Sequence, residues 1–109
     1  MKIKHIILYS AVLLLSCANS IYKGPHVDPV LKYAYDDWKT ECVQRNIKLR
    51  QNICDLDSII YDVLEDRVWG KCFGNKVVIN KRAVAPTDTF LIKLIMYHEL
   101  GHCAFDYRH

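Results

Sequence analysis

The residues best suited to chemistry lie near the C-terminus, where positions 98–102 read His-Glu-Leu-Gly-His. Histidines four residues apart project from one face of a helix, about 40° apart and one turn along, so His98 and His102 can bind one metal ion. Glu99 is offset from His98 by about 100°, which brings its carboxylate near that ion without making it a ligand. Zinc suits two imidazoles and lowers the pKa of a water it binds to about 7, so that a nearby carboxylate can take the proton. The spacing is therefore typical of zinc-dependent amide hydrolysis.

Two helices are predicted, one on each side of the middle of the chain. Asp28 is suited to cap the first, Pro29 suits its first turn, and apolar residues at helical spacing extend it to about residue 46. The second begins after the Pro-Thr-Asp of residues 86–88 and runs to about Phe105. The histidine motif therefore lies on a helix, as binding of one ion by both imidazoles requires.

Between the two helices the sequence has the pattern of strands. Branched residues at 58–64 predict one strand. Residues 68–73 and 76–80 flank Gly74-Asn75, a two-residue loop with glycine first that suits a tight hairpin. We therefore predict an α+β fold, in which a small, mostly antiparallel sheet separates an N-terminal helix from a C-terminal zinc-binding helix.

The first 16 residues have the features of an export signal: a basic start, a short, mostly apolar run and a small residue at the exit. The run is too short to cross a bilayer as a helix, which takes about twenty residues. Residues 14–17, Leu-Leu-Ser-Cys, resemble a bacterial lipobox, in which the cysteine is acylated and becomes the mature N-terminus. The alternative is an ordinary secretory signal that ends in cysteine. We expect residues 1–16 to be removed, Cys17 to carry lipid, residues 17–27 to form a tether, and residues 28–109 to form one domain.

This N-terminus also predicts where the protein resides and what it does not bind. Acyl chains hold a protein at a membrane surface by about 0.8 kcal/mol per buried methylene. Ala18 follows the cysteine where an aspartate would favour the inner membrane, so we expect the outer membrane of a bacterial envelope, facing the periplasm or the cell surface. Loss of Lys2 and Lys4 leaves 13 of the 15 basic residues against 12 acidic ones. A net charge near +1 without a basic cluster argues against nucleic-acid binding.

The motif and its flanks resemble a known family. Residues 98–103 read His-Glu-Leu-Gly-His-Cys and residues 104–109 read Ala-Phe-Asp-Tyr-Arg-His, which resembles the small zincin-like metallopeptidases of bacteria and phages, often lipoproteins. Gly-Lys-Cys at 70–72 and Lys-Val-Val-Ile-Asn at 76–80 correspond to the family's Gly-x-Cys segment and to the strand before its zinc helix. The resemblance covers about residues 27–109. It implies a zincin-like fold, zinc bound by His98, His102 and His109, and Glu99 as the catalytic base.

The third ligand is where the sequence departs from related patterns. Metzincins place a glycine three residues and a histidine six residues after the second histidine, and Phe105 and Arg108 occupy those positions here. His109 follows His102 by seven residues. Asp106 is the alternative third ligand, because some zincins use a carboxylate. Family members also continue beyond the third histidine into a methionine-containing segment, whereas this sequence ends at that histidine.

Two functional hypotheses follow from the motif. In the first, the chain is an enzyme: a lipid-anchored zinc metallopeptidase of bacterial or phage origin that hydrolyses a peptide or protein substrate. The intact Glu99 favours it. In the second, the chain is a zinc-binding envelope lipoprotein without turnover that acts as a binding or exclusion factor. The end of the sequence at His109 favours the second hypothesis.

Export also bears on the cysteines, because disulfides form in oxidising compartments. Four cysteines remain besides Cys17, and they suggest two disulfides, with free buried thiols as the alternative. Four cysteines allow three connectivities, among which the residues do not choose. The spacing favours disulfides over a zinc site made of these cysteines, since no two of them lie two to four residues apart. We expect Cys103 to pair with Cys72, which would link the motif helix to the sheet, and Cys42 to pair with Cys54.

Overall fold

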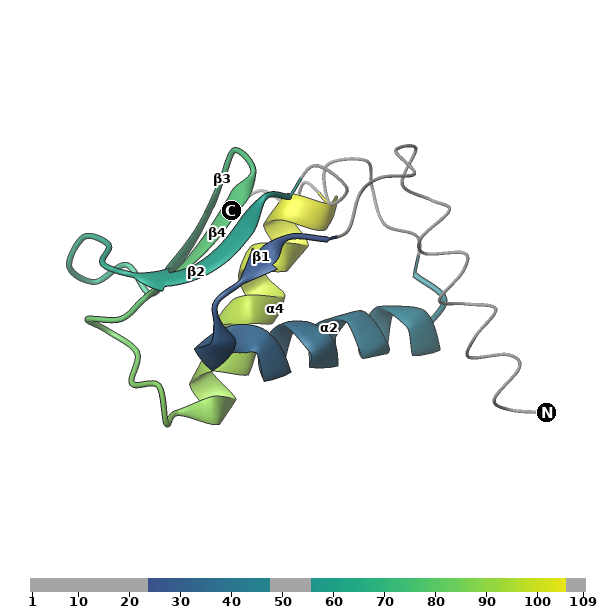
Figure 1. The fold of residues 1–109 in the computed structure, drawn as a ribbon, viewed down its shortest axis with the longest axis horizontal. Coiled ribbons are helices and arrows are strands. Elements are labelled where there is room, and N and C mark those ends of the chain that lie inside the picture. The colour runs from purple at the N-terminus through teal and green to yellow at the C-terminus, as the bar shows by residue number, and fades with distance from the viewer. Residues whose placement is uncertain (1–23, 48–55, 106–109) are drawn as a thin grey trace.

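The computed structural model describes residues 24–47 and 56–105, which form two helices and a four-stranded mixed sheet (Figure 1). The predicted α+β class is confirmed. The first helical segment consists of a 3-10 turn, η1 (Pro29–Leu31), followed by α2 (Lys32–Gln44), and the second is α4 (Thr89–Phe105). The strands are β1 (His26–Val27), β2 (Ser58–Asp62), β3 (Gly70–Phe73) and β4 (Lys76–Asn80). Both predicted helices and the predicted strands are therefore present, with ends that differ by a few residues.

The strand order is β1-β2-β4-β3, and this order corrects the prediction of a mostly antiparallel sheet. The hairpin around Gly74-Asn75 is antiparallel as predicted, since β3 pairs with β4 in that sense. However, β2 pairs in parallel with β4 and with β1. The reason is burial. Residues 77–80 of β4 are all buried and need partners on both sides, whereas β3 alternates between half-buried and exposed positions and takes the edge.

The start of the first helical segment is fastened to the sheet. Asp28 occupies the N-cap position of η1, but its side chain makes no capping hydrogen bond, contrary to the prediction. Its Oδ2 atom instead accepts a hydrogen bond from the backbone N–H of Tyr61 at 2.7 Å. The two preceding residues, His26 and Val27, were predicted to belong to the tether and form the parallel strand β1 beside β2. The sheet thus begins two residues before the predicted domain boundary.

The loop that leads from β2 to β3 is held by one buried amide. Asn80 is fully buried, and its Oδ1 atom accepts hydrogen bonds from the backbone N–H groups of Leu64 and Arg82, each at 3.1 Å. Its Nδ2 atom donates to the carbonyls of Glu65 at 3.1 Å and Val68 at 2.6 Å. A buried polar group requires such partners, because an unpaired one would cost about 1–3 kcal/mol. This network fixes the point at which β3 begins.

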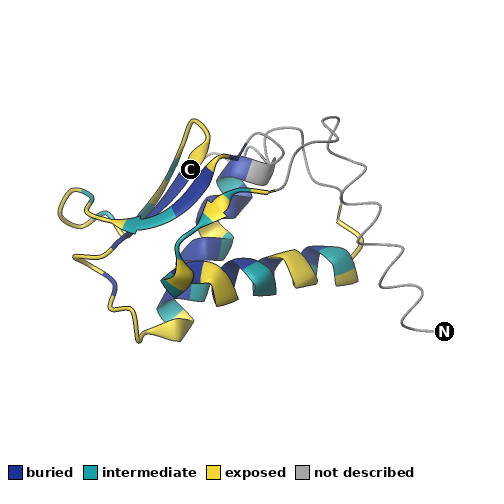
Figure 2. Ribbon diagram, in the orientation of Figure 1, coloured by how far each residue is buried: buried dark blue, intermediate teal, exposed yellow. Residues whose placement is uncertain are grey.

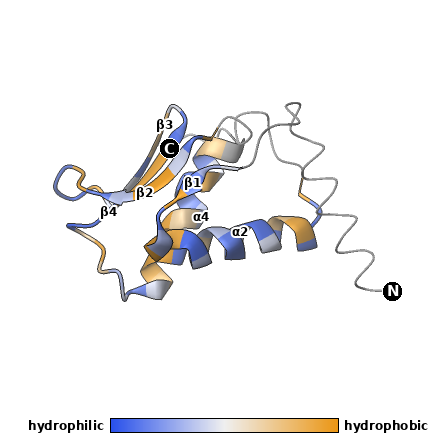
Figure 3. Ribbon diagram, viewed as in Figure 1, coloured by the Kyte–Doolittle hydropathy of each residue, from blue (hydrophilic) through white to orange (hydrophobic). Residues whose placement is uncertain are grey.

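The core lies between one face of the sheet and the two helices. Helix α4 contacts β3, β4 and α2, so it lies between the sheet and the first helix. Figure 3 shows that α2 carries more hydrophilic positions than α4, and Figure 2 shows that α2 alternates between buried and exposed positions. The largest fully buried side chains come from the helices, the strands and the connections: Leu31, Leu56, Ile59, Ile79, Ile92, Met96, Leu100, Val77, Val84 and Asn80.

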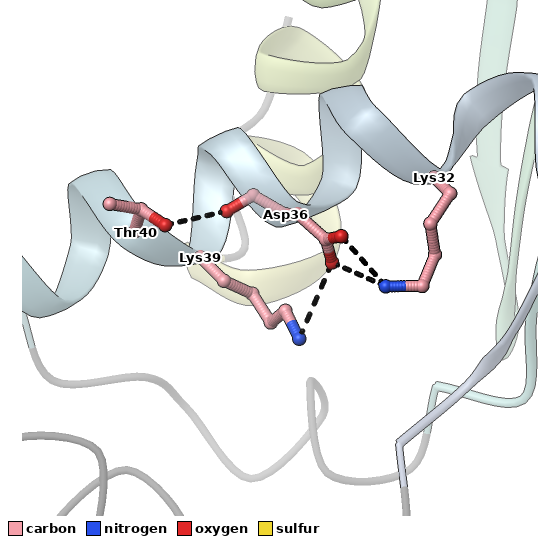
Figure 4. A network of polar contacts seen from close by, with 4 residues as sticks. All are labelled: Lys32, Asp36, Lys39 and Thr40. Carbon is pink, nitrogen blue, oxygen red and sulfur yellow. Dashed lines mark hydrogen bonds and ion pairs between the residues drawn. The ribbon is translucent and has the colours of Figure 1, made fainter. Parts of the chain in front are cut away.

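The outer face of α2 carries a network of exposed polar contacts (Figure 4). The Nζ atom of Lys32 bonds both carboxylate oxygens of Asp36 at 2.7 Å, and Lys39 Nζ lies 3.7 Å from Asp36 Oδ1. Thr40 Oγ1 donates to the Asp36 carbonyl at 2.9 Å. The hydrogen bond from Lys32 is the main reason that the pKa of Asp36 is lowered. Because an exposed pair one turn apart contributes about 0.3–0.5 kcal/mol, this face stabilises the helix slightly and faces solvent.

Neither helix of the described segments is both long enough and apolar enough to cross a membrane.

Candidate metal centre

The two motif histidines lie together on the last turns of α4. Their Nε2 atoms are 3.1 Å apart, and their rings meet edge to face at a centroid separation of 4.6 Å. Two nitrogens that bind one tetrahedral zinc at 2.0–2.1 Å would lie about 3.3 Å apart. The side chain of His98 is 55% exposed, and His102 is half-buried, so the pair can be reached from solvent. Both predicted ligands on the helix therefore lie side by side, with a hydrogen bond between their ring nitrogens and a nitrogen separation close to that of two ligands of one zinc ion.

Glu99 lies on the adjacent face of α4 and is largely buried. Its Oε2 atom is 4.0 Å from His98 Nε2, while its side chain is only 9% exposed. The one-residue offset on the helix explains this arrangement, because a rotation of about 100° directs Glu99 to the sheet while His98 faces outward. The carboxylate therefore lies beside the histidine pair, where a base could act on a molecule bound there.

The side of α4 that carries Glu99 faces β3. Ile95, Glu99 and Cys103 follow one another at four-residue spacing, so they form one row along the helix. Cys103 forms a disulfide with Cys72 of β3, with a Cα–Cα distance of 6.0 Å. The predicted Cys72–Cys103 pairing is thus confirmed. A covalent bond joins the motif helix to the edge strand one turn beyond Glu99.

The other predicted disulfide is not formed. Cys42 is a buried free thiol, which corrects the expected pairing with Cys54, a residue outside the described segments. The side chain of Cys42 lies on the buried face of α2 and packs in the core as an apolar group. Burial, together with the charge of Glu41, raises the pKa of the Cys42 thiol to about 11. The thiol therefore stays protonated at neutral pH.

A contact that the sequence did not reveal fixes α4 to α2. The hydroxyl of Tyr97 donates a hydrogen bond to Asp37 Oδ2 at 2.7 Å, and Lys93 Nζ lies 3.9 Å from Asp37 Oδ1. Burial, with that hydrogen bond, raises the pKa of Tyr97. The phenol is therefore neutral and held by the neighbouring helix. Asp37 carries no motif signal, so only the packing of the helices identifies it.

Both candidates for the third ligand, His109 and Asp106, lie outside the described segments, as does the lipidation candidate Cys17. Among the described residues, no group of three or more His, Cys, Asp or Glu side chains is arranged to hold a metal ion. The two histidines nevertheless suit zinc in type and spacing, because imidazole nitrogen is one of its usual donors and the 3.1 Å between the two nitrogens is close to the separation of two zinc ligands.

Comparison of the chain with protein-family models, with curated proteins and with solved structures found no match. The residues of the candidate centre are therefore the basis for assigning a function.

The Cys72–Cys103 bridge makes a direct prediction about stability. Replacing both cysteines by alanine should lower the free energy of unfolding by about 3–4 kcal/mol, because the bridge closes a loop over a separation of 31 residues. Denaturant unfolding measures the loss, and peptide mapping without reduction should recover the two segments linked. Cys42→Ala is the matched control, since it removes one buried sulfur but no bridge and should cost about 1 kcal/mol. Equal losses for the two variants would contradict a stabilising bridge.

Proposed function

We propose that the chain is a zinc-dependent peptide hydrolase. The observation that carries the proposal is the proximity of His98 Nε2 and His102 Nε2, which lie 3.1 Å apart, with the Glu99 carboxylate 4.0 Å from His98. Two imidazoles for the ion and a carboxylate beside them are the groups that amide hydrolysis at neutral pH requires. The resemblance of residues 98–109 to small zincin-like metallopeptidases supports the same function.

The roles of the residues follow from their positions. His98 and His102, with a third ligand for which His109 is the first candidate, would hold the ion. Zinc bound there would polarise the substrate carbonyl and lower the pKa of a coordinated water to about 7. Glu99 would accept the proton of the attacking water and then deliver it to the leaving amine, as a general base and acid. His98 and His102 come from one helix, so no loop has to become ordered to bring them together.

The surroundings of the three side chains support these roles. The exposure of His98 leaves space for a peptide segment to approach the ligands. Glu99 is shielded by the sheet, which holds its carboxylate on the side of the histidine pair away from bulk water. Such shielding strengthens electrostatic interactions at the site, because the local dielectric is lower than that of water.

We also propose that the hydrolase is a lipoprotein of a bacterial envelope, anchored through Cys17. The proposal depends on residues 14–17 and on the short apolar run before them. It places the substrate, a peptide or protein, at the surface of that membrane.

Glu99→Gln separates metal binding from catalysis. The variant should bind zinc as the unchanged protein does, because Glu99 is not a ligand, and should hydrolyse a peptide mixture at least 100-fold more slowly. Zinc content is measured by elemental analysis and hydrolysis by mass spectrometry of the peptides. Glu65→Gln is the matched control, because its side chain is 67% exposed and lies at the loop before β3.

The histidine pair is tested alongside. His98→Ala should lose zinc, whereas His26→Ala, which changes an exposed histidine on β1, should retain it. Zinc binding without hydrolysis in the unchanged protein would favour the binding lipoprotein. No zinc binding at all would exclude both hypotheses.

The third ligand is tested by a pair of variants near the end of the sequence. His109→Ala should lower zinc affinity by more than about 100-fold, since losing even a partner of a ligand costs 10–100-fold. Asp106→Ala should change it little. Competition with a chelator ranks the two, and the reverse ranking would transfer the role to Asp106.

Lipid anchoring is tested by Cys17→Ser. The hydroxyl cannot take the place of the thiol in lipoprotein acylation, so the variant should lose its lipid and leave the membrane fraction. Mass spectrometry of the N-terminal peptide and fractionation of the expressing cells measure the two effects. Ser16→Ala, which keeps a small residue before the cysteine, is the control and should stay anchored. Persistent membrane association of Cys17→Ser would refute the anchor.

A further inference from the structure

Gly70, the first residue of β3, lies against the row of α4 that carries Glu99. A Cβ atom added at Gly70 would lie 2.5 Å from Ile95 Cγ2, 3.1 Å from Glu99 Cγ and 3.3 Å from the carbonyl oxygen of Val78. Real Cβ atoms essentially never approach another heavy atom closer than 3.0 Å. The strand and the helix can therefore be this close only because residue 70 has no side chain.

This contact and the disulfide are two neighbouring points of the same interface. Gly70 and Cys72 lie two residues apart on one face of β3, and Glu99 and Cys103 lie one turn apart on one face of α4. The disulfide fixes the helix along the strand, and the glycine sets how closely the helix approaches. Between them they determine how closely the row of α4 that carries Glu99 lies against the sheet.

We propose that Gly70 is a positioning residue for Glu99: the space left by its missing side chain lets the Glu99 side chain lie against β3 with its carboxylate beside His98. This inference rests on the proposed hydrolase. A methyl group at position 70 would have two separable effects. It would push Ile95 and the helix away from the strand, which is a structural effect, and it would force Glu99 Cγ to move by a few tenths of an ångström.

The clash with Ile95 can be removed by shortening that side chain. Ile95→Ala deletes the Cγ2 atom that lies 2.5 Å from the added Cβ and leaves the contacts with Glu99 Cγ and with the Val78 carbonyl oxygen in place. The contact with Val78 is the same with and without the Glu99 side chain, so it cancels when the two are compared. The test therefore compares two disulfide-bonded proteins: the Ile95→Ala variant, and the same variant that also carries Gly70→Ala. Gly74→Ala in the same background is the matched control. Gly74 has φ +59° in the hairpin with open space around it, so its replacement should strain the turn without reaching Glu99.

The first measurement needs neither zinc nor activity. In the Ile95→Ala background, Gly70→Ala should lower the melting temperature by several degrees, and the loss should shrink when Glu99 is also replaced by alanine, because the atom in contact is then gone. Gly74→Ala should show the same loss with and without the Glu99 side chain. Equal losses for Gly70→Ala with and without that side chain would overturn the proposed contact.

The second measurement tests the functional consequence. Gly70→Ala in the Ile95→Ala background should lower kcat for peptide hydrolysis about tenfold, with KM and zinc affinity unchanged, because misplacing a catalytic group by 1 Å costs about 100-fold and this shift is smaller. Gly74→Ala should leave kcat unchanged. An unchanged kcat for Gly70→Ala, or a loss of zinc affinity as large as the loss of kcat, would overturn the positioning role. If the unchanged protein hydrolyses nothing, the proposed function fails and the positioning role with it, while the melting cycle still decides whether Gly70 holds Glu99.

Discussion

The packing of α4 on the edge strand β3 is the constraint on which the candidate centre depends. A disulfide between Cys72 and Cys103 joins the two elements, and the missing side chain of Gly70 lets them lie in close contact. Side chains on a helix are fixed in direction relative to one another, so an interface that sets the rotation of α4 also sets the direction of His98 and His102. The row that faces the strand (Ile95, Glu99 and Cys103) is offset by one residue from the histidines, which leaves His98 exposed and His102 half-buried.

The rest of the fold holds both partners of this interface in place. Asn80 binds the loop that precedes β3 and so fixes where the strand begins. Asp37 of α2 binds Tyr97 and Lys93 on the opposite side of α4. The helix is thus held through residues other than the histidines. Preorganisation of this kind would serve the proposed metal binding and catalysis, because a helix already held in place loses little conformational entropy when its side chains bind a ligand.

Features that depend on neighbours in the sequence could be predicted from it. Both helices, the hairpin at Gly74-Asn75 and the shared face of His98 and His102 follow from local geometry, and the structure has all of them. The carboxylate of Glu99 beside the pair follows from the same helical repeat. The residues left three cysteine connectivities open; of the one that we expected, the structure contains the Cys72–Cys103 bond, while Cys42 is a free thiol.

Features that depend on which elements meet were decided by the tertiary structure alone. The apolar sequence of β4 did not predict that this strand lies between β2 and β3. The neighbours of a strand depend on how both faces of the whole sheet are buried. Cys42 was expected to form a disulfide, but it lies on the buried face of α2 and packs in the core as a free thiol. Gly70 has no reactive side chain, so the sequence gives no sign of a role for it. Its role depends on its closeness to Glu99, and that closeness arises only when helix and strand pack together.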